Sequence, residues 1–426
     1  MIGRIDRTQA ARNSRTMTSQ PIRSDVALAG GGLVGLTLAL ALAQGGMRVA
    51  VADPMTQAQL LDERFDGRVS ALAFANVRMM RTLGLWDNLL PDAQPINDIL
   101  VSDGELGGQP SPFSLHFDHR EIGEVLGYIV ENRNIRRELL RAVEGNKGIV
   151  FLPGVAVDGL AVGEASTTLN LSNGQQIASP LTVAAEGRDS QLREAQGIRS
   201  VAWDYPQIGI VTTVEHERPH NGVAYEHFLP SGPFAILPMT GNRASLVWTE
   251  ETKDARRLIG LDEPEFTAEL KLRFGIHLGD VRPVGPRWSY PLKLHLARSY
   301  VQHRFALVGD AAHTIHPIAG QGLNLGLKDA ASLAETVLDA ARLGLDFGRS
   351  DVLERYERWR RFDSLALAAA TDGINRLMSN NIPPLRLARD LGMGAVDMIA
   401  PLRQFFMRHA GGDIGTLPRL LKGEAV

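Results

Sequence analysis

The chain has 426 residues, of which 44% are hydrophobic and 22% are charged, a composition typical of globular proteins and a length that favours two domains. Its net charge of -3 creates no long-range field that would attract nucleic acid. The absence of cysteine excludes disulfides, thiol nucleophiles and cysteine-ligated metals, and it is compatible with a reducing compartment.

Residues 1–24 contain five arginines against a single acid, Asp6, and show little apolar periodicity. This composition predicts a disordered tail. Two alternatives stay open, because an arginine-rich, acid-poor segment is also typical of transit peptides and because translation could begin at Met17.

The segment from Asp25 to Asp53 predicts a strand, a glycine turn, an Ala/Leu helix and a second strand that ends in an acid. Gly30 permits a tight turn, Gly32 lets the backbone approach a pyrophosphate, and Gly35 lets the helix pack closely on the sheet. The pyrophosphate would lie at the helix N-terminus, and Asp53 would accept hydrogen bonds from a ribose. This order of elements predicts a dinucleotide site.

The uncharged run from Val26 to Gln44 follows several arginines, so a signal peptide or a membrane span is an alternative. Four glycines interrupt the front of this run, and an alternating strand follows it directly. Both features favour the dinucleotide site.

Arg68 precedes a helix that we expect over about residues 75–83. Its guanidinium suits an oxygen-rich anion, although a solvated arginine at a helix start is the alternative. Residues 86–126 are rich in proline, glycine, aspartate and serine, which indicates loops and short strands outside the main sheet. A strand at 128–130 then leads into a helix over 131–140.

Three strand segments are expected next, at 149–161, 166–171 and 177–185. The last one ends in Glu186 and Gly187, a pair that favours a ribose or phosphate contact. Between residues 206 and 250, alternating segments separated by glycine-containing turns predict an inserted antiparallel sheet of about four strands.

A second informative stretch covers residues 305–329, where an apolar strand ends in a Gly-Asp pair and a loop leads to a long helix. Asp310 at the strand tip would bind sugar hydroxyls. The helix begins near Gly322, so the N–H groups of Leu323 and Asn324 would point toward a negative charge.

His313 and His316 show a His-x-x-His spacing in the same loop. Zincin histidines lie four apart on one helix with a glutamate between them, and this pattern is missing here. We therefore predict no metal site and expect both histidines to shape the cofactor site.

Helices are expected to end the chain, over about 322–343, 352–378 and 384–409, with a bend at Pro401. Methionine and phenylalanine make one side of the last helix apolar. Two interpretations stay open: packing on the core or on a second subunit, and a wall for a polyprenyl tail or a membrane-surface patch.

The glycine stretches and the Glu186 element follow the order found in flavoprotein aromatic hydroxylases, the p-hydroxybenzoate-hydroxylase-like group A monooxygenases. Residues 24–410 resemble this family. More narrowly, the chain is similar to the ubiquinone-biosynthesis hydroxylases in segments 67–72, 130–133, 230–238, 247–249 and 313–326. One departure is Glu186 itself, because the family usually has aspartate there.

This resemblance implies FAD as the cofactor and NADH or NADPH as the reductant. It assigns the pyrophosphate to Gly30, Gly32 and Gly35, the adenosine ribose to Asp53, the dinucleotide backbone to Arg68 and Arg133, and the ribityl chain to Asp310. The N–H groups of Leu323 and Asn324 would face the isoalloxazine, in a loop with Gly320 and Gly322. Glu186 and Gly309 are further cofactor-binding candidates. Pro317 and His313 are the catalytic candidates, with Pro317 lining the oxygen-reacting face. A flavin hydroperoxide would then hydroxylate a polyprenylated phenol.

The fold that the resemblance implies is α/β (α+β overall), with a Rossmann-like FAD-binding domain, an inserted antiparallel substrate domain and C-terminal helices. We expect the FAD-binding domain at 25–85, 127–200 and 290–375, the substrate domain at 86–126 and 201–289, and the helical segment at 376–426.

The expected partners are a polyprenylphenol and O2, without nucleic acid, in the cytoplasm. Peripheral contact with the inner membrane, a homo-oligomer and a quinone-synthesis complex stay open. Rival functions are a hydroxylase of another aromatic compound, a non-catalytic paralogue that binds a prenyl lipid, and a flavin halogenase. Halogenases carry a Trp-x-Trp-x-Ile-Pro motif, and the five tryptophans here form no such pair.

Overall fold

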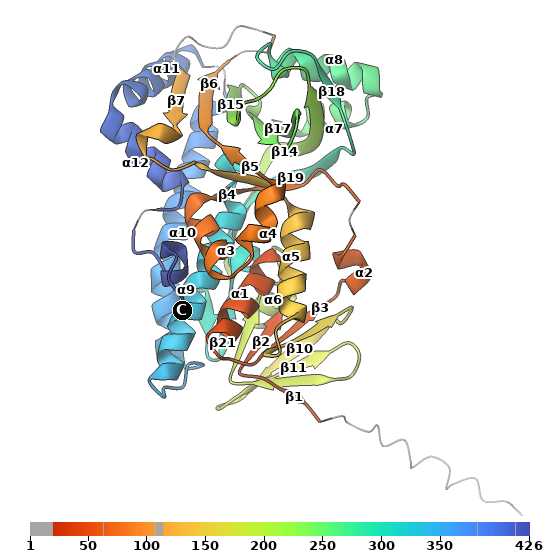
Figure 1. Cartoon of the computed structure of the whole chain (residues 1–426), viewed down its shortest axis with the longest axis vertical. Helices are drawn as coiled ribbons and strands as arrows, with labels where there is room; N and C mark the ends of the chain where they lie inside the picture. Colours follow the sequence, from red (N-terminus) through yellow and green to blue (C-terminus); the bar gives the residue numbers. More distant parts are fainter. Residues whose placement is uncertain (1–19, 63, 105, 108–113, 381, 414) are drawn as a thin grey trace, which may run out of the picture.

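The structure, a computed structural model, describes residues 20–426 apart from 63, 105, 108–113, 381 and 414. At its centre lies a six-stranded sheet with the order β20-β21-β13-β2-β3-β9 (Figure 1). Its strands are β2 (Val26–Ala29), β3 (Val49–Asp53), β9 (Ile149–Pro153), β13 (Leu181–Ala184), β20 (Val301–Gln302) and β21 (Phe305–Leu307). Every pair in this sheet is parallel except β20 with β21.

Three helices complete this parallel unit: α1 (Leu33–Gln44), α5 (Asn132–Glu144) and α9 (Gly322–Arg342). Strand β2 is apolar and buried at every position, which is the pattern of a strand covered on both faces. Helix α1 packs against both α5 and α9 (Figure 1), and one continuous apolar core joins the sheet to these helices. The predicted strand, glycine turn, helix and second strand are therefore confirmed.

A larger, mainly antiparallel sheet of nine strands forms the other half of the molecule, with the order β22-β19-β14-β17-β16-β15-β6-β7 and β18 paired to β14. The four strands expected between residues 206 and 250 are β14 (Ser200–His216), β15 (Val223–Leu229), β16 (Gly232–Met239) and β17 (Arg243–Glu251). More distant segments extend them: β6 (Asp98–Asp103), β7 (Ser114–Asp118), β18 (Val281–Pro283), β19 (Trp288–Ala297) and β22 (His313–Thr314).

A smaller sheet of four strands, with the order β1-β12-β11-β10, corrects the expectations at two places. The segment 177–185 is not one strand: β12 (Gln176–Ser179) joins β10 (Val157–Val162) and β11 (Thr167–Leu171), whereas β13 joins the central sheet. Pro180 separates the two strands, because proline cannot donate a hydrogen bond to a sheet. The predicted tail is wrong at its end, since β1 (Ile22–Arg23) pairs with β12; residues 1–19 lie outside the described part of the chain.

A three-stranded sheet, β4 (Val69–Ala73), β8 (Gly127–Glu131) and β5 (Ala93–Ile96), joins the two halves. The remaining α-helices described are α2 (Gln57–Leu60), α3 (Phe74–Thr82), α4 (Trp86–Leu89), α6 (Gln191–Ala195), α7 (Thr252–Ile259), α8 (Glu263–Phe274), α10 (Ser350–Met378), α11 (Pro383–Met398), α12 (Ala400–Ala410) and α13 (Arg419–Lys422). Pro401 does not bend one helix: it lies in the first turn of α12, where proline is tolerated.

The two faces of the nine-stranded sheet have different neighbours. One face forms an apolar core with α7 and α8 that includes Phe234, Trp248 and Phe266. The other face packs through Ala224 and Leu237 on the three-stranded sheet. This second face therefore looks toward the half of the molecule that contains both glycine stretches.

Candidate cofactor and substrate site

The first glycine stretch forms the turn between β2 and α1. Gly30 has a φ of +105°, and a Cβ there would overlap the carbonyl oxygen of Ala185. A Cβ at Gly35 would overlap the carbonyl oxygen of Gly30, so α1 can approach the strand only with glycine at this position. At Gly32, by contrast, no described atom lies within 4 Å of a Cβ. This open space lies at the N-terminus of α1, whose first turn contains no acid and whose N-cap residue is Gly32 itself. The geometry suits an anion such as a pyrophosphate.

Asp53 holds this turn in place. Its Oδ2 accepts a hydrogen bond from the Gly31 N–H at 2.6 Å and its Oδ1 accepts one from the Met55 N–H at 2.8 Å. A carboxylate has further lone pairs, so Asp53 can also accept bonds from a ribose.

Arg136, on α5, is a candidate site residue that the sequence did not reveal. Burial lowers the pKa of its guanidinium, as does the charge of Arg68, while the nearby acids Asp66 and Asp53 raise it. Arg136 makes no hydrogen bond or ion pair with any residue that the structure describes. A half-buried, unpaired guanidinium near the turn of Asp53 is suited to a phosphate. The spacing of Arg133 and Arg136 on one helix was the signal that could have identified it.

Arg68 and Arg133 lie on neighbouring segments, because the Asn132 N–H donates to the Arg68 carbonyl oxygen at 3.0 Å. Arg68 pairs with Asp66 at 2.6 Å and is half exposed. Arg133 pairs with Glu131 at 2.6 Å. Each of these arginines is therefore held by a neighbouring acid, and the charge of Arg68 is close enough to Arg136 to lower the pKa of that guanidinium.

The second glycine stretch begins at the end of β21, where Gly309 has a φ of +61°. A Cβ at Gly309 would lie 3.4 Å from Cγ2 of Val34, and one at Gly326 would lie 2.8 Å from the same atom. Val34 belongs to the first turn of α1, so the two glycine stretches meet there. The structure thus brings together segments that are far apart in the sequence.

Asp310 follows Gly309 at the tip of β21. Its carboxyl is accessible to solvent, yet the protein surrounds it closely, and this desolvation raises its pKa. Within the described part of the chain it makes no hydrogen bond. It is therefore available to a ligand that offers hydroxyl groups.

The N-terminus of α9 lies next in the same stretch. Gly320 has a φ of +61°, and a Cβ there would lie 3.3 Å from Cβ of Ala71. Around the Cβ position of Gly322 the structure describes no atom within 4 Å. The first turn of α9 contains no acid, and the side chain of its N-cap residue, Gln321, donates to the Ala410 carbonyl oxygen. The N–H groups of this turn therefore face an open, uncapped end, as at α1.

The comparisons with known proteins agree with this geometry. The FAD binding domain family matches residues 23–368. The chain is 50% identical over 406 residues to the ubiquinone hydroxylase UbiL of Rhodospirillum rubrum, which covers 94% of this chain and 93% of the relative. It is 34% identical over 400 residues to the 3-demethoxyubiquinol 3-hydroxylase of Escherichia coli, covering 93% and 100% of the two chains. This chain belongs to the ubiquinone-biosynthesis hydroxylase family of FAD-dependent monooxygenases.

The fold of this hydroxylase also matches a solved structure. The crystal structure of p-nitrophenol 4-monooxygenase PnpA from Pseudomonas putida superimposes with a TM-score of 0.76, over 93% of this chain and 100% of that one. At 18% identity this likeness concerns the fold. The predicted fold class and the FAD cofactor are confirmed. The two open helix N-termini, which side chains at Gly32 and Gly322 would fill, fit that cofactor.

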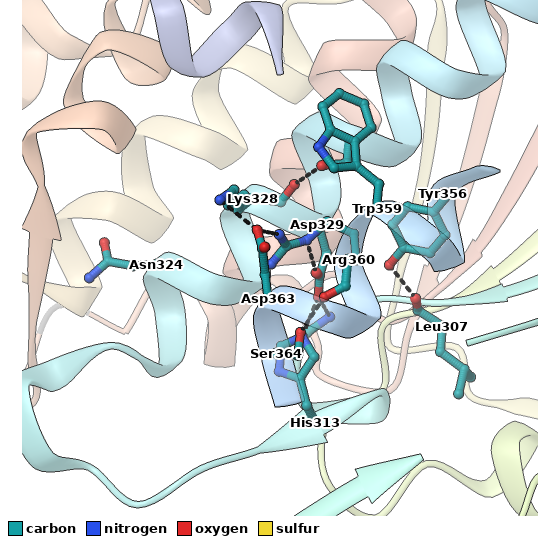
Figure 2. A network of polar contacts seen from close by, with 12 residues as sticks. Leu307, His313, Asn324, Lys328, Asp329, Tyr356, Trp359, Arg360, Asp363 and Ser364 are labelled. Carbon is teal, nitrogen blue, oxygen red and sulfur yellow. Dashed lines mark hydrogen bonds and ion pairs between the residues drawn. The ribbon is translucent and has the colours of Figure 1, made fainter. Parts of the chain in front are cut away.

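A buried polar network stands behind the second glycine stretch of the hydroxylase (Figure 2). Asp329 on α9 accepts hydrogen bonds from the Gly309 N–H at 3.0 Å, from His313 Nε2 at 2.5 Å and from Arg360 Nε at 2.8 Å. Burial by itself raises the pKa of Asp329, but the charges and hydrogen bonds of His313 and Arg360 lower it. Asp363 then joins Arg360 to Lys328. The network fixes the loop at Gly309 to α9 and α10.

This position bears on the catalytic role expected for His313. Its side chain is 1% exposed and its Nε2 is committed to Asp329, so the ring is enclosed within the network. This placement favours a positioning role for His313. The sequence could have suggested it only through the acid at Asp329, which is too distant in the chain for a local motif.

His316 and Pro317 end the same loop. The ring of His316 is fully buried, stacks edge-on against Tyr205, and has no hydrogen-bond partner among the described residues. Burial lowers the pKa of His316 to about 4, so the ring is neutral at pH 7. Pro317 is partly accessible, and its carbonyl oxygen accepts a hydrogen bond from the Gly320 N–H at 2.9 Å. Pro317 therefore sits beside the N-terminus of α9.

The side chains of Glu186 and Asn324, two expected cofactor contacts, form hydrogen bonds with neighbouring parts of the protein. The Glu186 carboxylate accepts hydrogen bonds from Ser190 Oγ at 2.6 Å and from the Leu192 N–H at 3.1 Å, so it stabilises the start of α6. The Asn324 side chain accepts bonds from the Ala73 N–H and from Asn76, and it locks α9 against β4 and α3. The longer acid at Glu186 thus turns into its own loop, and only the backbone of Asn324 faces the open helix end.

Possible metal ligands lie outside the loop of His313 and His316. Among the residues that the structure describes, one group of acids and histidines has ligand atoms within 4.8 Å of one another: Asp98, Asp118 and His119. Two of its members already have partners, since Asp98 pairs with His116 and Asp118 with Arg120. The group does not include His313 or His316.

Proposed function

We propose that this FAD-dependent hydroxylase acts on the aromatic ring of a polyprenylated phenol in ubiquinone biosynthesis, with O2 as co-substrate and NADH or NADPH as reductant. The observation that carries the proposal is the meeting of two uncapped helix N-termini, at Gly32 and Gly322, beside the apolar face of a large antiparallel sheet. The printed names of the relatives, ubiquinone hydroxylase and 3-demethoxyubiquinol 3-hydroxylase, support the substrate class.

The adenosine half of the cofactor is assigned to the first glycine stretch. The N–H groups at the start of α1 would face the pyrophosphate, and Gly30 and Gly35 keep the turn narrow enough for this. Asp53 would accept bonds from the ribose. Arg136, with Arg68 and Arg133 at the edge, would balance the phosphate charges.

The flavin half is assigned to the second stretch. Asp310, with Gly309 beside it, would accept hydrogen bonds from the ribityl hydroxyls. The N–H groups of Leu323 and Asn324 would stabilise negative charge on the ring system, which requires the close approach that Gly320 and Gly322 permit. Pro317 would form the wall where oxygen reacts. FAD supplies the redox chemistry when it is bound, and the protein orients the ring and excludes water.

The test is turnover by the purified holoenzyme. We expect yellow protein whose flavin is reduced by NADH or NADPH faster when a 2-polyprenylphenol is present, and a product heavier by one oxygen atom. Colourless protein, or bound flavin that neither reductant reduces, would instead identify a non-catalytic paralogue. Hydroxylation of simple phenols but not of prenylated ones would assign another aromatic substrate.

We also propose that the enzyme is a cytoplasmic protein that touches the inner membrane, where a prenylated substrate resides. No described helix has the length and apolarity needed to cross a bilayer. Helices α10, α11 and α12 nevertheless expose large apolar side chains: Phe362, Leu365, Ile374, Leu377, Leu391, Met398, Phe405 and Phe406. Such exposure marks a lipid or protein contact.

Co-sedimentation with liposomes of anionic bacterial lipids tests this surface. We expect Phe405→Ser combined with Phe406→Ser to reduce sedimentation while the flavin content stays unchanged. If the same variant instead dissociates a dimer in size-exclusion chromatography, the surface is a subunit interface.

A further inference from the structure

Glu226 is one of the acids on the sheet face that looks toward the cofactor half. Glu226 lies in the middle of β15, opposite Ala235 of β16 and beside Val101 of β6. Side chains alternate along a strand, so its neighbours Tyr225 and His227 point to the opposite face. Tyr225 belongs to the core with α7 and α8, and His227 Nδ1 lies 2.7 Å from Ser102 Oγ. Of these three residues, only Glu226 therefore faces the cofactor half.

The same face leads directly to the second glycine stretch. Ala224, two positions before Glu226, packs in one apolar cluster with Leu237 and Ala71. Ala71 is the residue that the Cβ position of Gly320 would touch, and its carbonyl oxygen accepts a hydrogen bond from Asn324 Nδ2 at 2.8 Å. Two residues along a strand span about 7 Å. The carboxyl thus lies one side-chain step beyond the cluster that borders the start of α9.

Glu226 has no partner on this face. It makes no hydrogen bond and no ion pair with the residues that the structure describes. Its side chain is partly accessible although the protein encloses it, and this burial raises its pKa to about 7. An enclosed acid without a partner is costly in a stable core, so such a group at a site face points to a ligand.

The charges around this carboxyl are few. Strands β16, β5 and β4 contain no titratable residue. On β17, Arg243 stands opposite Met239 of this face and pairs with Glu131 of β8 at 3.5 Å, while Glu251 lies on the same face at the exposed end of the strand. On β6, Asp103 stands opposite Phe228 and forms a buried pair with Arg389 at 2.7 Å. On α12, which adds Met407 to the apolar cluster, Arg403 pairs with Glu121 at 2.8 Å. Arg243, Asp103 and Arg403 each have a counter-charge and Glu251 is exposed, so desolvation governs Glu226.

We propose that Glu226 binds the hydroxyl group of the phenol substrate and takes its proton as the ring is oxygenated. This inference rests on the proposed hydroxylase function. The phenolic O–H bond breaks, the proton moves to the Glu226 carboxylate, and the electron pair stays on the ring oxygen, which makes the ring carbons more nucleophilic. The oxidant is O2 and the reductant NADH or NADPH, as in the hydroxylation itself. A base on an otherwise apolar face also orients the ring by one directional contact.

The test compares Glu226→Gln with wild type, because the amide keeps the size and hydrogen bonding of the side chain but cannot take the proton. With 2-farnesylphenol we expect kcat to fall about 10²-fold at pH 7, the usual contribution of a general base. In wild type kcat/KM should rise with pH as the carboxyl ionises, and this rise should disappear in Glu226→Gln. Glu251→Gln is the matched control, since Glu251 is exposed on the same sheet.

A second measurement does not depend on turnover. We would titrate 2-farnesyl-4-nitrophenol, whose absorbance reports its ionisation, while it is bound to the FAD-loaded protein without reductant. A neighbouring carboxylate disfavours a second anion, so the bound probe should ionise at higher pH in wild type and Glu251→Gln than in Glu226→Gln. Equal ionisation in all three proteins, or no binding by wild type, would overturn the assignment.

The two measurements separate the possible failures. Wild type that oxidises NADH or NADPH without hydroxylating 2-farnesylphenol would refute the proposed function, while the probe titration still decides whether Glu226 meets the phenol. A shifted titration with unchanged kcat in Glu226→Gln would show a contact without proton transfer, which refutes the catalytic role.

Discussion

The cofactor half and the substrate-facing sheet form their parts of the site by different means. On the cofactor side the ligand-facing groups are mostly backbone: the starts of α1 and α9, opened by Gly32 and Gly322. On the sheet side they are side chains on a largely apolar face, with the acid Glu226 among them. Backbone sites depend on glycine and packing, whereas side-chain sites depend on strand register. Substitutions in the two regions should therefore fail in different ways.

The largest effect is expected where backbone placement depends on a buried charge. Asp329→Ala removes the acceptor for Gly309, His313 and Arg360, and it leaves the fully buried Arg360 without its closest acid. We expect a loss of about 3–5 kcal/mol in the free energy of unfolding, measured by urea denaturation. Asp351→Ala is the control, because its pair with Arg349 is exposed and should contribute less than about 1 kcal/mol.

The acid dependence of this network follows from the pKa of Asp329. That pKa is lowered in the folded protein, so the stabilisation is complete above the unfolded value of 3.8 and is lost as the pH falls through the folded value. The difference between wild type and Asp329→Ala should therefore shrink at low pH. A difference that stays constant down to pH 3 would contradict the charge assignment.

A pair of glycine substitutions tests the backbone site itself. Gly30→Ala should lower the free energy of unfolding by about 3 kcal/mol and remove most of the bound flavin. The φ of +105° and the Ala185 carbonyl oxygen both exclude a methyl group at this position. Gly32→Ala has room for the methyl group and a φ of -72°, so the apoprotein should keep its stability. We expect its FAD affinity to fall roughly tenfold or more, since the methyl group occupies the anion site. An unchanged FAD affinity in a fluorescence titration would show that the pyrophosphate does not bind at Gly32.

The comparison also shows which parts of the site a sequence can predict. The turn that contains Gly30 and Gly35, with Asp53 beside it, could be predicted because strand, turn and helix follow one another locally, and each residue type has a fixed geometric task. The partnership of His313 with Asp329 and Arg360 depends on the packing of α9 against α10, which no local pattern encodes. The outline of the inserted sheet, by contrast, was predicted from its turns, which are local features.

Finer features of the fold depended on tertiary structure. Residues 98–103 and 114–118 joined the large sheet through pairing with a distant strand, which composition alone did not indicate. Glu226 drew no attention because one acid in an alternating strand is ordinary. Only the register shows that it faces inward, and only the packing shows that none of the described residues is its partner. Arg136 was similarly hidden in an arginine-rich helix.

A smaller effect is expected for Asp310, whose role as a flavin contact is still a prediction. Asp310→Ala should weaken FAD binding by roughly 1.5–3 kcal/mol through loss of a charge-assisted hydrogen bond. Folding should be little affected, because this carboxyl makes no bond with the described residues. The dissociation constant of FAD, measured by flavin fluorescence, checks this. Full flavin occupancy with an unchanged dissociation constant would remove Asp310 from the site.

The smallest expected effect concerns Glu226 on the sheet side, and it is a change in the free energy of unfolding rather than in catalysis. The pKa of Glu226 is raised from 4.5 to about 7 by burial, so between these values the folded protein binds more protons than the unfolded chain. Linkage then requires the free energy of unfolding to fall as the pH rises through this window, and to level off above pH 7. Glu226→Gln cannot ionise and should escape this decline.

We therefore expect the free energy of unfolding of Glu226→Gln to equal that of wild type at pH 4.5 and to exceed it by about 1–2 kcal/mol at pH 8. This difference is less than the full pKa shift allows, because the side chain is partly accessible. Urea denaturation at the two pH values, with Glu251→Gln as the exposed control, measures this difference. Parallel pH profiles for wild type and Glu226→Gln would mean that the carboxyl is well solvated, and the sheet face would then lack the enclosed acid that sets it apart from the backbone-built cofactor site.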